Sequence, residues 1–202
     1  GHGVSKDAPR ALEYCRKAAI QGYANAQFNM GVLYEKGHCV PQDKAYAVEW
    51  YVKAANQGHA NAQCNVGLMY EKGHGVSKDY VRALEWYRKA AEQKYAPAQC
   101  NMGVMYEYGC GVSKDNVRAV EWYSKAASQG DCNAQYNMGI MYENGDGVPQ
   151  DEVRAVELYW KAAQQGDADA LYNLGFMYEN GIGVSKNATC AAECYSRAAE
   201  QR

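Results

Sequence analysis

The sequence aligns with itself from end to end, without a gap, when it is shifted by 36 residues. Glycine recurs at this period at Gly37, Gly73, Gly109, Gly145 and Gly181, and paired alanines recur in step with it. A period of about 20–50 residues is typical of solenoids and other repeat arrays. In such proteins one repeat cannot bury its apolar side alone, so neighbouring repeats stack to form a continuous core.

Each repeat contains a leading and a trailing helix, as residues 131–166 illustrate. Asp131 and Asn133 are suited to cap the start of the leading helix, and Gly145 is suited to end it. Asp151 is placed to cap the trailing helix. Between the caps, apolar residues at helical spacing predict a core-facing side of the leading helix, formed by Ala134, Met138, Met141 and Tyr142.

We therefore expect an all-α fold, a right-handed superhelical solenoid of antiparallel helical hairpins in one domain over residues 1–202. A half repeat over 1–22, with a trailing helix at about 7–21, precedes five complete hairpins, at 23–58, 59–94, 95–130, 131–166 and 167–202. The sequence opens within a motif and without a methionine, so we expect it to be part of a longer chain.

The repeated unit resembles the Sel-1-like repeat, a relative of the tetratricopeptide repeat. The resemblance is carried by Ala62, Met69-Tyr70, Gly73-His74-Gly75-Val76, Asp79, Ala83, Trp86-Tyr87 and Ala90-Ala91, and by their equivalents along the whole chain. It implies a superhelix whose leading helices line a concave face. It also implies a scaffold or adaptor role in multiprotein complexes.

The side of each leading helix opposite the predicted core is the candidate binding surface. It combines two apolar columns with an unbroken asparagine column, and an asparagine amide both donates and accepts hydrogen bonds, as an extended peptide requires. The candidate partner-binding residues are Phe28, Asn29, Val32, Asn65, Leu68, Asn101, Val104, Tyr136, Asn137, Ile140, Tyr172, Asn173 and Phe176. The alternative is that the apolar columns pack neighbouring hairpins and that asparagine ties neighbouring backbones together.

Two further columns of the leading helix call for an explanation. A glycine inside a helix costs about 1 kcal/mol relative to alanine, so we expect a close helix–helix approach at Gly31, Gly67, Gly103, Gly139 and Gly175. Glutamates end the same helices at Glu35, Glu71, Glu107, Glu143 and Glu179. We expect them to pair locally with Arg82, Arg118 or Arg154, with an acidic row for a basic partner as the alternative.

Several kinds of chemistry are disfavoured. The net charge of −2 and the absence of basic runs argue against nucleic acid, and no stretch approaches the roughly 20 apolar residues of a membrane span. The eight cysteines are scattered over seven columns, so we expect reduced, buried thiols and a cytoplasmic location. His2, His38 and His74 share a loop column, but stacking keeps successive loops apart, so we expect neither a metal nor another cofactor.

The sequence thus predicts a protein–protein interaction scaffold that binds a peptide segment or a partner domain, and not an enzyme. One alternative follows from the family resemblance: some cysteine-rich relatives bind or hydrolyse penicillin-type compounds. The other alternative is a purely architectural spacer.

Overall fold

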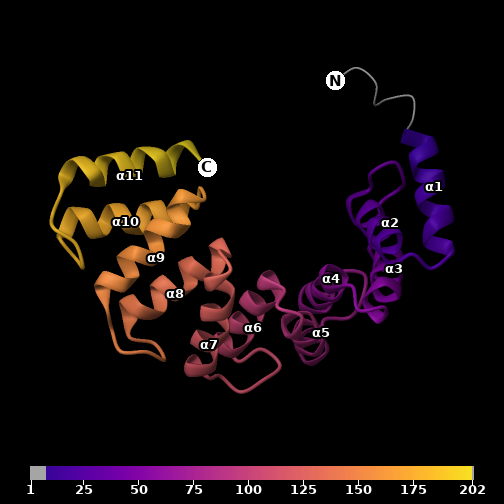
Figure 1. Ribbon diagram of the computed structural model, residues 1–202, viewed down its shortest axis with the longest axis horizontal. Coiled ribbons are helices and arrows are strands. Elements are labelled where there is room, and N and C mark those ends of the chain that lie inside the picture. Colours follow the sequence, from indigo (N-terminus) through magenta and orange to yellow (C-terminus); the bar gives the residue numbers. More distant parts are fainter. Residues whose placement is uncertain (1–7, 202) are drawn as a thin grey trace. The chain divides into compact units, whose positions relative to one another are not determined.

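The computed structural model describes residues 8–201, and every regular element in that range is an α-helix of 13 residues (Figure 1). The helices are α1 (Ala8–Ile20), α2 (Ala24–Lys36), α3 (Lys44–Asn56), α4 (Ala60–Lys72), α5 (Tyr80–Glu92), α6 (Ala96–Tyr108), α7 (Asn116–Ser128), α8 (Cys132–Asn144), α9 (Glu152–Gln164), α10 (Ala168–Asn180) and α11 (Ala188–Glu200). The predicted all-helical repeat fold is confirmed. The expected trailing helix at about 7–21 is α1.

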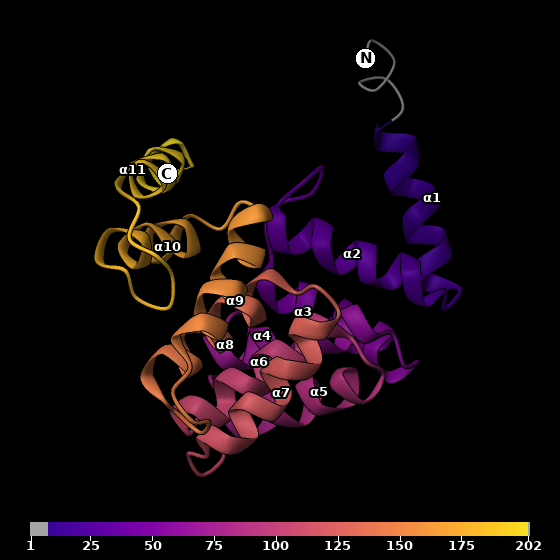
Figure 2. The same cartoon turned by 60° about the vertical axis from the view of Figure 1, so that its left-hand side comes forward.

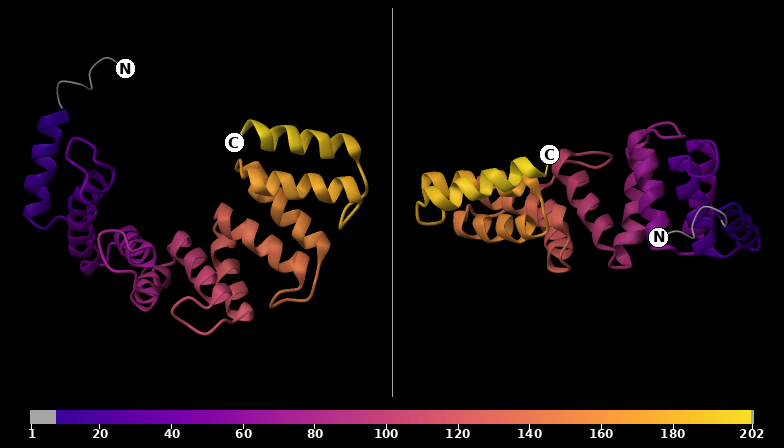
Figure 3. Two further views of the ribbon diagram at one scale, coloured as in Figure 1. Left: turned by 180° about the vertical axis from the view of Figure 1, so that it is seen from behind. Right: turned by 90° about the horizontal axis from the view of Figure 1, so that it is seen from above.

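Even-numbered helices lead each hairpin and odd-numbered helices trail, as α10 and α11 illustrate (Figures 2 and 3). The chain divides into two compact units, one ending at Ala98 and the other beginning at Gln99. In the first unit each helix from α1 to α5 packs on the next, and in the second the same holds from α7 to α11. A core therefore runs through each unit, as stacked repeats require.

The expected caps set the helix ends. Asp43, Asp79, Asp115, Asp151 and Asn187 precede the trailing helices, and each side chain accepts a hydrogen bond from the backbone N–H three residues on, at 2.9–3.1 Å. Asp131 caps α8 in the same way, whereas Asn133 lies inside that helix. Gly145 ends α8 in the left-handed conformation, with φ of 76°.

Glutamines join neighbouring helices at their ends, a feature that the sequence analysis did not identify. Gln57, Gln93, Gln129 and Gln165 follow the trailing helices and donate to a glutamine of the leading helix, at 2.6–2.8 Å. In turn Gln27 and Gln63 donate to Ala19 and Ala55 carbonyls of the preceding trailing helix, both at 3.1 Å. These buried amides satisfy carbonyls that a helix end leaves without an intrahelical donor.

The mid-helix glycines make room for tyrosine rings, which confirms the expected close approach and gives its cause. Tyr51, Tyr87, Tyr123 and Tyr159 of the trailing helices are fully buried. A Cβ atom added at Gly31, Gly67, Gly103 or Gly139 would lie only 2.5–2.7 Å from carbons of the corresponding ring. The stability lost by placing glycine in a helix is therefore offset by the burial of a large aromatic side chain.

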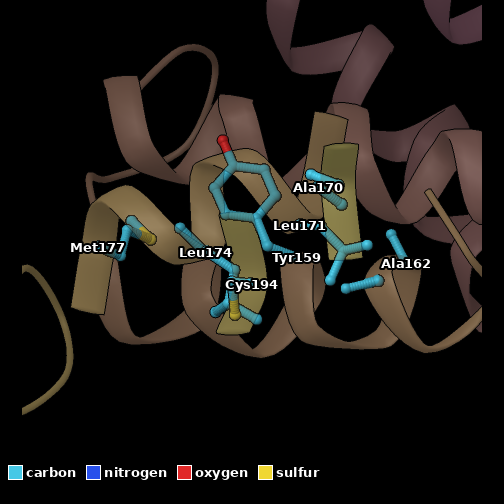
Figure 4. Packing of buried hydrophobic residues seen from close by; sticks show 10 residues of the cluster. Tyr159, Ala162, Ala170, Leu171, Leu174, Met177 and Cys194 are labelled. Carbon is cyan, nitrogen blue, oxygen red and sulfur yellow. The ribbon is translucent and has the colours of Figure 1, made fainter. Parts of the chain in front are cut away.

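The core between hairpins is built from small and branched side chains around each tyrosine. In the second unit Tyr159 packs with Ala162 of α9 and with Ala170 and Leu171 of α10 (Figure 4). Of the predicted core residues of α8, Ala134 and Met141 are buried, while Met138 and Tyr142 are half-buried.

Candidate protein-binding surface

The glutamate column is used inside each hairpin. Tyr51, Tyr87, Tyr123, Tyr159 and Tyr195 donate their hydroxyls to Glu35, Glu71, Glu107, Glu143 and Glu179, at 2.5–2.8 Å. The predicted pairing of these glutamates with arginine is therefore wrong. Arg82, Arg118 and Arg154 lie on the same trailing helices as the tyrosines, but the group that hydrogen-bonds to the glutamate carboxylate is the buried tyrosine hydroxyl and not the guanidinium.

The arginines pair elsewhere. Arg82, Arg118 and Arg154 each lie 3.4 Å from the aspartate that caps their own helix. Each guanidinium also lies 5.4–5.7 Å from the ring centre of a leading-helix tyrosine, Tyr70, Tyr106 or Tyr142. These ion pairs and cation–π contacts lie on the surface of the hairpins, and each contributes modestly to stability.

Burial is the main cause of a strong rise in the pKa of the buried tyrosines, and the glutamate hydrogen bond raises the pKa further. The side-chain amide of an asparagine of the next leading helix offsets part of this rise in pKa, Asn65 at Tyr51 and Asn173 at Tyr159. At these two positions the asparagine column takes part in packing between hairpins.

The predicted apolar columns are half-buried where another hairpin covers them. Phe28 and Val32 pack against the cluster shared by α3 and α4, and Phe28 also stacks on His59 with ring centres 4.8 Å apart. Tyr136 and Ile140 pack against the cluster shared by α9, α10 and α11. The remaining half-buried members of the predicted set are Leu68, Val104, Asn65, Asn101, Asn137 and Asn173, while Asn29 is exposed.

At α10 the same two columns are open to solvent. Tyr172 is 54% exposed and Phe176 is 44% exposed. Their equivalents one repeat earlier, Tyr136 and Ile140, are half-buried because they pack against the cluster shared by α9, α10 and α11. Within the described chain no hairpin follows α11, so the two aromatic side chains remain uncovered, one turn apart on one side of the helix.

A mostly apolar pocket of about 450 Å³ lies beside Tyr172. It is lined by Tyr172 and Glu179 of α10 and by Tyr195, Ala198 and Ala199 of α11. The equivalents of these five residues one repeat earlier are Tyr136, Glu143, Tyr159, Ala162 and Ala163. There, Ala162, Ala163 and Tyr159 form one buried cluster with Ala170 and Leu171 of the next leading helix.

The pocket therefore has the shape of a seat for a leading helix. Tyr195, Ala198 and Ala199 are not among the predicted binding residues, because the prediction was restricted to leading helices. The 36-residue period could have identified these three residues, because they lie one repeat after Tyr159, Ala162 and Ala163.

No disulfide joins the cysteines within residues 8–201; Cys64, Cys100 and Cys194 are buried, while Cys39 is exposed, contrary to the expectation of buried thiols. The same range holds no cluster of three or more histidine, cysteine or acidic side chains arranged to bind a metal. His2 lies outside the described residues. No described helix has both the length and the apolar composition to cross a bilayer.

Solved structures of similar chains come from several bacteria. A protective antigen present in uropathogenic Escherichia coli strains, with an SLR fold, shares 43% identity over 95% of this chain, with a TM-score of 0.88; this chain covers 41% of that protein. A Sel1 repeat protein from Oxalobacter formigenes shares 42% identity over 89% of this chain and 72% of its own, with a TM-score of 0.83.

An immunity protein from Pseudomonas aeruginosa is a more distant match, with 30% identity and a TM-score of 0.61, over 88% of this chain and 65% of its own. No curated protein matches the sequence. The family model for the Sel1 repeat matches six segments, residues 1–23, 24–59, 60–95, 96–131, 132–167 and 168–202. The chain therefore belongs to the Sel1 repeat family, whose members generally act as protein-interaction scaffolds.

Proposed function

We propose that this chain is a non-enzymatic protein-interaction scaffold, and that α10 and α11 form a seat for one further helix, supplied by a partner protein or by a further repeat of a longer chain. The observation that supports the proposal most directly is the exposure of Tyr172 and Phe176 beside the pocket that contains Tyr195 and Ala198. Large aromatic side chains in contact with a pocket are the residues that most often dominate the energy of a protein–protein interface.

A helix is the occupant that the repeat favours. One hairpin earlier, the equivalent surface is covered by α10, which buries Ala170, Leu171 and Leu174 against it. A partner helix with a small residue, an apolar residue next to it and another three positions later would present the same contacts. This is recognition of a helix in a groove, with anchors on successive turns.

The negative charge at the rim of the pocket indicates which side chains a bound helix should carry. The Glu179 carboxylate is exposed at the rim of the pocket and accepts the Tyr195 hydroxyl at 2.8 Å. A lysine or arginine on the partner helix would complement this carboxylate and improve the association rate and specificity more than the affinity.

A peptide copy of the helix that fills the equivalent seat provides the test. The peptide covers residues 167–181 of this chain and is stapled to hold it helical, because an isolated helix of this length is marginal in water. Titration into the isotope-labelled protein is expected to shift amide resonances of Tyr195, Ala198 and Ala199. Shifts confined to other hairpins, or no shifts at millimolar peptide, would refute the helical seat.

Matched variants separate this surface from general apolar stickiness. Tyr172→Ala with Phe176→Ser removes both aromatic anchors, whereas Val117→Ser with Val153→Ser removes two comparably exposed apolar side chains from trailing helices. Loss of two interface anchors costs at least about 2 kcal/mol, which is roughly 30-fold in Kd. Binding equally weakened by both pairs of substitutions would count against a specific site.

A further inference from the structure

Helix α11 carries two cysteines one turn apart, and both line a pocket that shares no lining residue with the proposed helix seat. Cys190 and Cys194 are four positions apart, so they lie on the same side of the helix. The pocket has a volume of about 160 Å³ and is also lined by residues of α9 and α10. Cys194 is 8% exposed, Cys190 is half-buried, and both are free thiols.

The solenoid itself does not require this pair of thiols. The equivalent pairs in the earlier complete hairpins are Tyr46 and Trp50, Arg82 and Trp86, Arg118 and Trp122, and Arg154 and Leu158. No other two cysteines of the sequence are four positions apart. The last hairpin alone therefore combines two thiols with the pocket on this side of its trailing helix.

The spacing of the two cysteines favours a shared metal ion over a disulfide. Side chains four positions apart on a helix have Cβ atoms about 5–6 Å apart, whereas a disulfide requires about 3.5–4.5 Å. Two thiolates that bind one ion, each at roughly 2.3 Å, hold their sulfur atoms up to about 4.6 Å apart. Side chains that converge from neighbouring turns of the helix can span this separation.

The donor set selects the kind of ion. Thiolates prefer soft ions such as Cu(I), which two thiolates can hold in a linear arrangement. A structural Zn(II) site needs four ligands. Within residues 8–201 no third histidine, cysteine or acidic side chain is arranged with the pair to bind a metal. The two thiols therefore fit Cu(I) better than Zn(II).

The charges around the pocket suit an anionic complex. A Cu(I) ion with two thiolates carries one negative charge, and the Arg197 guanidinium is the cation among the lining residues. Cys190 lies in the first turn of α11, where the helix dipole also favours negative charge. Glu193 is the one acidic lining residue and opposes these two contributions, while α9 and α10 contribute no charged side chain to the lining.

We propose that Cys190 and Cys194 bind one Cu(I) ion as a dithiolate, with Arg197 balancing the charge of the complex. Two S–H bonds break, two S–Cu bonds form and two protons pass to solvent. Copper remains Cu(I), so the step requires neither an oxidant nor a reductant. Ala163 and Leu174, each 3% exposed, provide an apolar wall beside the ion.

Anaerobic titration of Cu(I) into the reduced protein, in competition with the chromogenic chelator bicinchoninate, tests the proposal. The wild type is expected to retain one Cu(I) per chain and to keep it in the presence of equimolar Zn(II). Binding should also quench the fluorescence of Trp160, because its indole lines the same pocket. Failure to retain Cu(I), or its displacement by equimolar Zn(II), would overturn the proposal.

Variants tie the ion to this pair of cysteines. Cys190→Ser and Cys194→Ala are each expected to lose the retained ion, with circular dichroism confirming that the helices remain. Cys39→Ser with Cys110→Ser removes two other cysteines that are not fully buried and is expected to keep one ion. Copper retained by either α11 variant, or lost from the control variant, would place the ion elsewhere.

A gain-of-site variant keeps the test decisive if Cys194→Ala fails to fold. Arg154→Cys with Leu158→Cys creates the same spacing at the equivalent positions of α9, where Lys161 takes the place of Arg197. This variant is expected to retain about two Cu(I) ions per chain. Retention of one ion by the variant and none by the wild type would show that the natural pair is not a site.

Discussion

Substituting Gly103 by alanine tests the packing that holds each hairpin together. The added Cβ would lie 2.5 Å from both Cδ1 and Cε1 of Tyr123, so the ring must move. Tyr123 is fully buried, and its hydroxyl donates to Glu107 at 2.6 Å, so a displaced ring also strains or breaks that hydrogen bond.

The expected magnitude follows from three opposing contributions. Overpacking costs about 1–3 kcal/mol, and loss of a hydrogen bond to a charged group costs about 1.5–3 kcal/mol. Replacing a mid-helix glycine by alanine returns about 1 kcal/mol of helix propensity. We therefore expect Gly103→Ala to lower the free energy of unfolding by about 1.5–5 kcal/mol.

Urea unfolding followed by circular dichroism measures this loss, and a double-mutant cycle assigns its cause. In a Tyr123→Leu background the ring and its hydroxyl are absent, so Gly103→Ala should cost much less than in the wild type. A Gly103→Ala protein as stable as the wild type, or an equal loss in both backgrounds, would refute the explanation of the glycine column.

Three further predictions concern the tyrosines, the loops and the caps. Burial raises the pKa of Tyr51, Tyr87, Tyr123 and Tyr159 in the folded state. Above about pH 10 the unfolded state therefore loses tyrosine protons that the folded state retains. The free energy of unfolding should be constant below that pH and then fall by up to about 1.4 kcal/mol per pH unit for each tyrosine. Urea unfolding between about pH 8 and about pH 11 checks this, with Tyr159→Phe expected to reduce the slope and an unchanged slope counting against it. Lys94 has φ of 62° where the other hairpins have glycine, so Lys94→Gly should stabilise the protein by about 1 kcal/mol in thermal unfolding, and Gly58→Ala should destabilise it by a similar amount. Asp115→Ala removes the cap of α7 and should cost about 1 kcal/mol, whereas Asp115→Asn should be nearly neutral; equal losses in the two variants would argue against capping.

The fold was predictable because each repeat reports independently on the same local structure. Gly145 and Asp151 each occupy a column in which nearly every hairpin has a residue of the same type, so helix ends could be placed without knowledge of the packing. The mid-helix glycines also pointed correctly to a close approach. The identity of the approaching group, the ring of Tyr123 for Gly103, required the direction of a side chain from the facing helix.

The electrostatic partners were less predictable for the same reason. Glu107, Tyr123 and Arg118 all belong to regular columns, so the repeat period is consistent with either pairing of the glutamate. The structure separates them because the buried phenol extends along the helix interface to the carboxylate, while the guanidinium returns to its own cap, Asp115.

The candidate sites depend on what each column meets next. Tyr136 and Tyr172 occupy one column, yet only Tyr172 is mostly exposed, because no hairpin covers α10 in the described chain. The replacement of a core tryptophan by Cys194 was visible in the sequence.

The most direct test of the proposed helix seat is the Kd of the stapled 167–181 peptide, measured by titration into the purified protein. The account predicts that Tyr172→Ala with Phe176→Ser raises this Kd at least roughly 30-fold. It also predicts that Val117→Ser with Val153→Ser leaves the Kd within about two-fold of the wild-type value, as expected for residues outside the interface. Equal affinity of the wild type and the Tyr172/Phe176 variant would contradict the account.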